Sequence, residues 1–164
     1  MNDIEEILVC LEKSPLLLKN LVASIPRELL KKNRIPGKWN IHEHACHLVG
    51  VQPMFIERFR MFKQHQEPVF EVYIPGKTVQ EDLMSMDLDD SLGRFEGYRD
   101  ELIRQVKSMD KDLWQRHGRH DEYIEYTPYI MLRHILSHDH VHMYRIEELW
   151  LTRDEYLPKG IGGG

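Results

Sequence analysis

The stretch TPYIMLRHILSHDHVHMYRIEEL, residues 127–149, carries the clearest structural signal in the chain. It begins with a threonine followed by a proline, a pair that suits the N-cap and the first position of an α-helix. Apolar side chains then recur every three or four residues, which predicts an amphipathic helix over residues 128–152. One stripe of this helix consists of Met131, Ile135, His138, His142, Ile146 and Leu149. Two histidines therefore occupy positions at which such a helix normally buries apolar side chains.

Three further segments have the same periodicity, over residues 2–24, 40–64 and 88–109. In the first, Pro15 is expected to kink the helix or to mark a restart after Ser14. In the second, Asn40 and Glu43 have the spacing of a capping box. Four long amphipathic helices predict an all-α protein folded as a four-helix bundle.

The segments between these helices are less regular. IPRELLKKN, residues 25–33, reads as a short extra turn, and PVFEVYI, residues 68–74, is the one stretch with the character of a strand. The connection over residues 65–87 is long enough to let its two helices run parallel. Long connections often cover a site, and HQEPVFEVYIPGK, residues 65–77, is the segment expected to do so here.

Length and composition restrict the class of protein. The 164 residues predict one domain over residues 1–155 and a disordered glycine-rich tail over residues 156–164. The formal net charge is −5, and the basic runs KKNR and ERFRMFK are short enough to be solvated helix faces, so we expect no nucleic-acid partner. Cys10 and Cys46 are too few for a disulfide scaffold and are interpreted as small buried apolar residues. Without a secretory signal or an apolar run long enough to span a membrane, we expect a cytoplasmic protein.

Helical phase separates the four histidines of HILSHDHVH. His138 and His142 are four residues apart and share the buried stripe, whereas His134 lies at its edge. His140 is about 200° from His138 and is expected to face solvent. Burying two imidazoles costs several kcal/mol unless both are hydrogen-bonded or bound to a metal. A shared metal ion would satisfy both rings at once.

A third ligand must come from elsewhere in the chain, and His47 is the best candidate. It lies about two turns into the second predicted helix, beside the stripe that faces the bundle interior. The remaining histidines are expected to be exposed, either near the start of that helix or in loops: His42, His44, His65, His117 and His120.

Several well-known metal and nucleophile patterns are incomplete in this chain. The zinc-protease pattern HExxH fails because Cys46 stands where the second histidine is needed. A di-iron bundle requires two Glu-x-x-His motifs, which this chain lacks. The nucleophile elbow of serine hydrolases is also missing. What remains is a mononuclear site with three histidines and open positions, which suits Zn, Ni, Fe or Mn. Glu43 and Asp139 are candidate partners for the ligand rings, and these two residues and Tyr144 are unranked candidates for a general base.

The chain resembles the DinB-like superfamily of four-helix-bundle metalloproteins, which includes the YfiT-like metal-dependent proteins. The resemblance is carried by PGKWNIHEHACHL at 36–48, ERFRMF at 57–62 and HILSHDHVHMYRIEEL at 134–149. Trp39 stands eight residues before His47, and His138 and His142 form the family's H-x-x-x-H pair. The chain departs from the family pattern at Arg145, where a glutamine is usual.

The resemblance implies an up-down-down-up bundle and a divalent metal held by His47, His138 and His142. It also implies a small-molecule substrate, a low-molecular-weight thiol in some members, and a homodimer. The favoured hypothesis is therefore a metal-dependent enzyme, with thiol-dependent transfer as the reaction class. The alternatives are a metal-dependent hydrolase, a non-catalytic metal-binding or stress-response small-molecule-binding bundle, and a metal-free core of hydrogen-bonded histidines.

Overall fold

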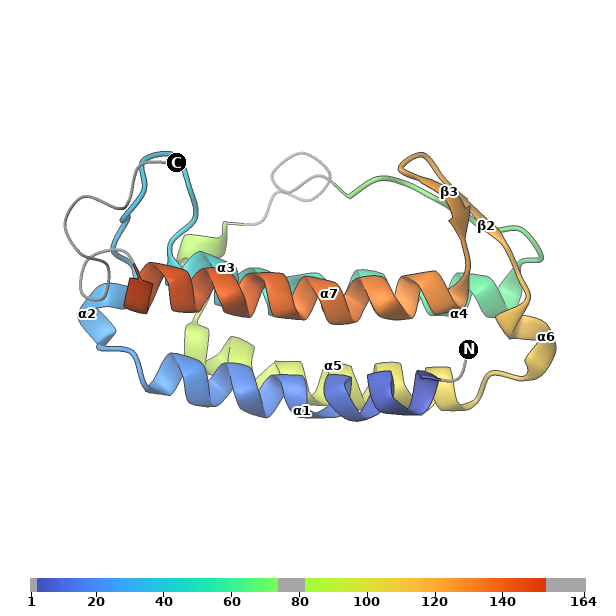
Figure 1. Ribbon diagram of the computed structural model, residues 1–164, viewed down its shortest axis with the longest axis horizontal. Coiled ribbons are helices and arrows are strands. Elements are labelled where there is room, and N and C mark those ends of the chain that lie inside the picture. The colour runs from blue at the N-terminus through green and yellow to red at the C-terminus, as the bar shows by residue number, and fades with distance from the viewer. Residues whose placement is uncertain (1–2, 74–81, 153–164) are drawn as a thin grey trace.

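The computed structural model describes residues 3–73 and 82–152 and has a mostly helical architecture. Four helical columns form the bundle: α1 (Ile4–Ala23), α3 (Ile41–Gly50) followed by α4 (Gln52–Gln64), α5 (Leu88–Lys107) and α7 (Pro128–Glu147). Both α1 and the α3–α4 column pack against α5 and α7. The chain runs one way in α1 and α7 and the other way in α3–α4 and α5 (Figure 1). This is the expected four-helix bundle with up-down-down-up topology.

The prediction of a single helix over residues 40–64 is wrong in one respect, because the helix is broken into α3 and α4 at Val51. Pro53 lies in the first turn of α4, where its missing N–H costs no hydrogen bond. Val51 itself keeps right-handed helical angles, so the change of direction is small. The apolar stripe predicted across both pieces is buried throughout: Ile41, Ala45, Leu48, Phe55, Phe59 and Phe62.

The first predicted helix continues through Pro15 and does not restart after Ser14. The Ser14 hydroxyl donates to the Cys10 carbonyl one turn earlier, at 3.2 Å. Cys10 itself is exposed, which corrects the interpretation of this residue as buried, because it lies about 200° around the helix from the buried Leu8. Cys46 is buried as predicted.

The helix starts follow the predicted signals. Asn40 and Glu43 form a complete capping box at the start of α3. The Thr127 side chain accepts a hydrogen bond from the Ile130 amide at the start of α7. Both caps satisfy amide groups that a helix start leaves without partners, and they fix where the two histidine-bearing helices begin.

Short elements connect the columns. They are α2 (Arg27–Leu30), the 3₁₀ turn η1 (Leu83–Ser85), α6 (Lys111–Trp114) and a π-helical turn, η2 (Glu148–Thr152). Of these, α2 falls in the predicted extra turn. Among the described residues, no helix is long and apolar enough to cross a membrane.

A small sheet lies at the end of the bundle where α4 ends and α7 begins (Figure 1). Its strands are β1 (Val69–Phe70), β2 (Gly118–His120) and β3 (Tyr123–Tyr126), with β1 parallel and β3 antiparallel to β2. The segment 68–74 thus contains a strand, whereas β2 and β3 were not predicted. Gly118 is required here, because any Cβ at this position would collide with the Phe70 ring.

Candidate metal centre

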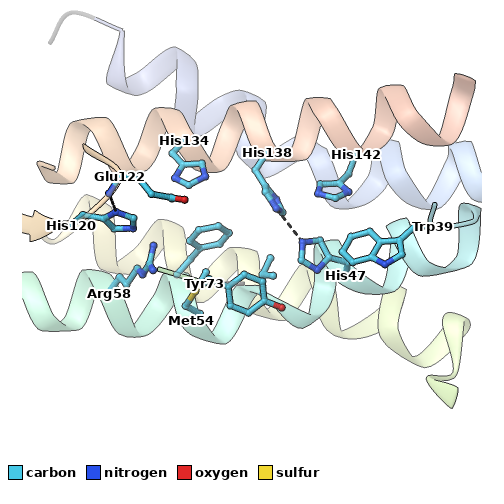
Figure 2. Close-up of a pocket in the computed structure, with 12 residues that line it drawn as sticks. Trp39, His47, Met54, Arg58, Tyr73, His120, Glu122, His134, His138 and His142 are labelled. Atoms are coloured by element: carbon cyan, nitrogen blue, oxygen red, sulfur yellow. Dashed lines mark hydrogen bonds between the residues drawn. The ribbon is translucent and has the colours of Figure 1, made fainter. Parts of the chain in front are cut away.

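Three histidines converge between α3 and α7. His47 reaches across from α3, and His138 and His142 reach toward it from successive turns of α7 (Figure 2). One ligand atom from each residue lies within 4.8 Å of the other two. The Nε2 atoms of His47 and His138 are 3.2 Å apart. The structure therefore brings together the three residues predicted as ligands, and metal binding by them remains a prediction.

Aromatic side chains surround this triad. The Trp39 ring lies 4.7 Å from the His47 ring and 6.0 Å from the His142 ring, between ring centroids. Phe55 meets His138 edge-on at 5.8 Å, and Tyr73 lies 5.9 Å from His47. Tyr73 belongs to the segment expected to cover a site, and residues 74–77 of that segment lie outside the described residues. These aromatic side chains shield the three imidazoles from water.

Burial keeps these imidazoles neutral. It lowers the pKa of His47 to about 4, that of His142 to about 3 and that of His138 to about 2, and each ring disfavours a charge on its neighbours. Neutral imidazole is the form that donates a lone pair to a metal. The donor set at pH 7 is therefore ready to bind a cation.

The spacing of the nitrogens also fits a metal ion. Two imidazole nitrogens that are 3.2 Å apart and each about 2.0–2.1 Å from one ion subtend about 100° at that ion, close to tetrahedral. The Nδ1 atom of His138 is buried and has no hydrogen-bond partner among the described residues. With a metal at Nε2, Nδ1 carries the proton of the neutral ring, so its lack of a partner is the same in the metal-bound and the metal-free alternatives.

His44 and His42 were expected to be exposed, and both expectations are wrong. His44 is partly buried, and its Nδ1 lies 2.9 Å from Nδ1 of His142, so Nε2 is the nitrogen of His142 left for a metal. His42 is buried, with Nε2 3.0 Å from the Leu83 carbonyl. Both rings are covered by segments distant in sequence, which helical phase within α3 does not reveal.

The other histidines divide between the interior and the surface. His134 is partly buried, and its Nδ1 lies 3.2 Å from the Tyr123 hydroxyl. His140, His65 and His117 are exposed as predicted. His120 was expected on the surface but is only 7% exposed, because β2 carries it under the hairpin.

The three candidates for a general base lie away from the described lining of the cavity. The Glu43 carboxylate accepts from the Asn40 amide in the capping box. Asp139 is buried in an ion pair with Arg99, at 2.7 Å. Tyr144 is 59% exposed. None of them is placed to act on a ligand beside the triad.

A cavity of about 280 Å³ opens from the triad along α4 and α7. Figure 2 shows the triad and Trp39 at one end, Arg58, His120 and Glu122 at the other, and His134 between them on α7, with its ring centroid 6.3 Å from that of His138. The described residues that line it are Trp39, His47, Val51, Met54, Phe55, Arg58, Tyr73, His120, Glu122, His134, His138 and His142. The sequence did not predict the polar end, because part of it lies on a hairpin that carries no clear signal. RHDEYIEY, residues 119–126, lacks the Asn-Gly or Asp-Gly turn typical of a hairpin.

The metal-free protein is expected to lose stability as the pH falls below about 6.5, the ordinary histidine pKa of an unfolded chain. The folded triad has lower pKa values, so in acid the unfolded chain takes up protons that the folded chain excludes. Each triad histidine contributes a loss of about 1.4 kcal/mol per pH unit between its two pKa values. Urea unfolding in the presence of a chelator, at a series of pH values down to about 5, measures this slope. The exposed variant His140→Gln should keep it, and a flat profile in the wild type would contradict the neutral triad.

Comparison with known proteins places the chain in a family. The family model of the DinB superfamily matches residues 11–146. Among solved structures the chain is similar to YfiT from Bacillus subtilis, described as a probable metal-dependent hydrolase with an unusual four-helix bundle topology. That likeness has a TM-score of 0.79 at 21% identity and covers 88% of this chain and 84% of YfiT. No curated protein matches the sequence significantly. With the family model covering most of its length, the chain belongs to the DinB superfamily.

Proposed function

We propose that the protein is a metal-dependent enzyme in which His47, His138 and His142 hold one divalent cation. The observation that carries this proposal is the convergence of three imidazoles, one buried and two partly buried, at the end of a cavity. Catalytic zinc sites use three protein ligands, whereas structural sites use four. A closed structural site would need a fourth ligand, for which Glu43 and His134 are the candidates. Both are engaged elsewhere, Glu43 in the helix cap and His134 beside Tyr123. This supports an enzyme over a structural metal site.

Hydrolysis of a small substrate is the reaction class we propose first, because YfiT is described as a probable metal-dependent hydrolase. A divalent cation in such a site supplies Lewis acidity to a carbonyl or phosphoryl oxygen. The chain itself supplies His134, whose pKa is lowered by burial and which is therefore neutral at pH 7. In the tautomer whose Nδ1–H donates to the Tyr123 oxygen, Nε2 of His134 can accept a proton from the attacking nucleophile.

Thiol-dependent transfer is the second candidate, and the structure restricts how it would work. No cysteine is among the described residues that line the cavity. Burial raises the pKa of Cys46 to about 11, and Cys10 is exposed on α1. A reactive thiolate would therefore have to come from a co-substrate in solution.

The two reaction classes can be separated by assay. The full chain, loaded in turn with Zn, Ni, Fe or Mn, is incubated with a panel of esters, amides and electrophiles, with and without cysteine or glutathione. The proposal expects turnover that a chelator removes and that His138→Ala abolishes. His134→Gln should keep the metal but lower kcat by about 10²–10⁴. Turnover without thiol identifies a hydrolase, strict thiol dependence a transferase, and turnover unaffected by the chelator would contradict both.

His44 is expected to act on the metal site through His142. Its ring lies against Nδ1 of His142 and holds the imidazole so that Nε2 faces the other two ligands. Loss of such an outer partner lowers metal affinity by about 10–100-fold. Zinc competition titrations of His44→Phe and His44→Gln measure the effect, with the exposed His140→Gln as control. Unchanged affinity in both His44 variants would show that the contact does not orient the ligand.

A further inference from the structure

Arg58 is a buried guanidinium at the end of the cavity opposite the triad (Figure 2). It is 6% exposed, and it forms no ion pair with any residue in the described ranges 3–73 and 82–152. Arg99, the other buried arginine of these ranges, is paired with Asp139 at 2.7 Å. Buried charges are normally paired, so the isolation of Arg58 calls for a counter-charge.

The contacts of Arg58 with the protein are to neutral groups. Nη1 donates to the Tyr126 hydroxyl at 3.2 Å, and Nη2 donates to the Glu71 carbonyl at 2.6 Å. Its guanidinium carbon lies 5.7 Å from the centre of the Phe70 ring. These contacts fix the orientation of the guanidinium but use only part of its fork of N–H donors. The side chain lines the cavity, so the remaining donors are available to a ligand there.

The other titratable groups at this end leave the positive charge of Arg58 in place. His120 and His134 line the cavity, and burial together with the charge of Arg58 lowers the pKa of both, so they are neutral at pH 7. Glu122 is exposed, and solvent screens its charge. Arg58 is thus the one cation at pH 7 among the described lining residues, which suits a monoanion better than a phosphate dianion.

We propose that Arg58 binds a carboxylate of the small-molecule substrate, so that the cavity selects compounds with an acid group distant from the reacting group. The part of this that concerns a reaction rests on the proposed function, whereas carboxylate binding does not. His47 and Arg58 are eleven residues apart along α3 and α4, which corresponds to about 16 Å of helix. A substrate that contacts both ends of the cavity is therefore an elongated molecule, with Arg58 setting which end lies away from the triad.

The test uses butyrate and its uncharged isostere butyramide with the full chain. The Nε–H resonance of Arg58 is followed by ¹⁵N NMR and assigned by its absence in Arg58→Lys. Butyrate is expected to shift this resonance in a saturable way, and butyramide is not. In the variants, butyrate binding is followed by the backbone amide resonances of residues that line the cavity. It should be weaker by about tenfold or more in Arg58→Met, in part restored in Arg58→Lys, and unchanged in Arg60→Gln, an exposed arginine of the same helix.

The metal-free and zinc-loaded proteins are titrated separately, because carboxylates also bind metal ions. Selective binding of butyrate by the metal-free protein supports the proposal even if the triad holds no metal. Equal responses to butyrate and butyramide, or no response of the wild-type resonance, would overturn it and leave the metal-site proposal intact. The wild-type titration decides the question even if Arg58→Met fails to fold.

Discussion

Replacing His138 by alanine is expected to weaken divalent-metal binding by about 100-fold or more. This is a larger effect than that of losing a residue, such as His44, that only contacts a ligand ring. His138 is central to the triad, with its Nε2 facing His47 and its ring centroid 4.4 Å from that of His142. Losing one of three donors leaves a pair, and an alanine cannot replace the imidazole with another ligand. Competition with a chromophoric zinc chelator measures the affinities of the wild type and of His47→Ala, His138→Ala and His142→Ala.

The control for this series is His140→Ala, two residues away on the same helix but exposed. It should bind zinc as the wild type does. The triad would be wrong if two of its alanine variants retained wild-type affinity, and adventitious surface binding would be indicated if His140→Ala lost affinity to the same extent.

Replacing Asp139 by alanine is expected to destabilise the fold by about 3–5 kcal/mol. Asp139 and Arg99 are both fully enclosed, at 0% and 1% exposed, and their side chains meet at 2.7 Å. Burial raises the pKa of the Asp139 carboxyl, and the Arg99 guanidinium opposes that shift. Removing the carboxylate leaves a buried guanidinium without its counter-charge, which costs more than the pair itself contributes. The change in the free energy of unfolding is measured by urea denaturation.

Two variants separate this explanation from simple loss of packing. The double variant Arg99→Met with Asp139→Leu should recover most of the stability, because it removes both charges and keeps apolar volume. Glu67→Ala breaks an exposed pair with Arg119 and should change stability by no more than about 1 kcal/mol. If the double variant is as unstable as Asp139→Ala, the isolated charge is not the cause.

Local sequence signals predicted the helices well. The capping residues Asn40 and Thr127 mark real helix starts because a cap depends on atoms only a few residues away. The spacing of apolar residues predicted which face of each helix is buried, and the buried stripe continues across the break at Val51. The pairing of His47 with His138 and His142 was predicted from the clustering of histidines and the position of His47 in its helix. The up-down-down-up topology was implied by the family resemblance, because periodicity cannot state which helices are neighbours.

The errors at His42, His120 and Arg58 share one physical cause, which is burial by segments distant in sequence. His42 is covered by the Leu83 carbonyl, 41 residues away. His120 is covered through strand pairing, which the weak hairpin signal concealed. Arg58 was predicted to be part of a solvated face, yet Tyr126 of β3 and Glu71, the residue after β1, enclose it. His120 and Arg58 line the cavity, so the end of the cavity opposite the triad is the part of the site that the sequence predicted least.

Zinc K-edge X-ray absorption of the full chain, loaded with one equivalent of zinc, tests the central claim most directly. The account predicts a first shell of nitrogen and oxygen donors at about 2.0–2.1 Å with the outer-shell scattering of three imidazoles. His138→Ala should lose imidazole scattering, and His140→Ala should not. A sulfur shell at about 2.3 Å, or a shell of oxygen donors without imidazoles, would contradict a metal site built from His47, His138 and His142.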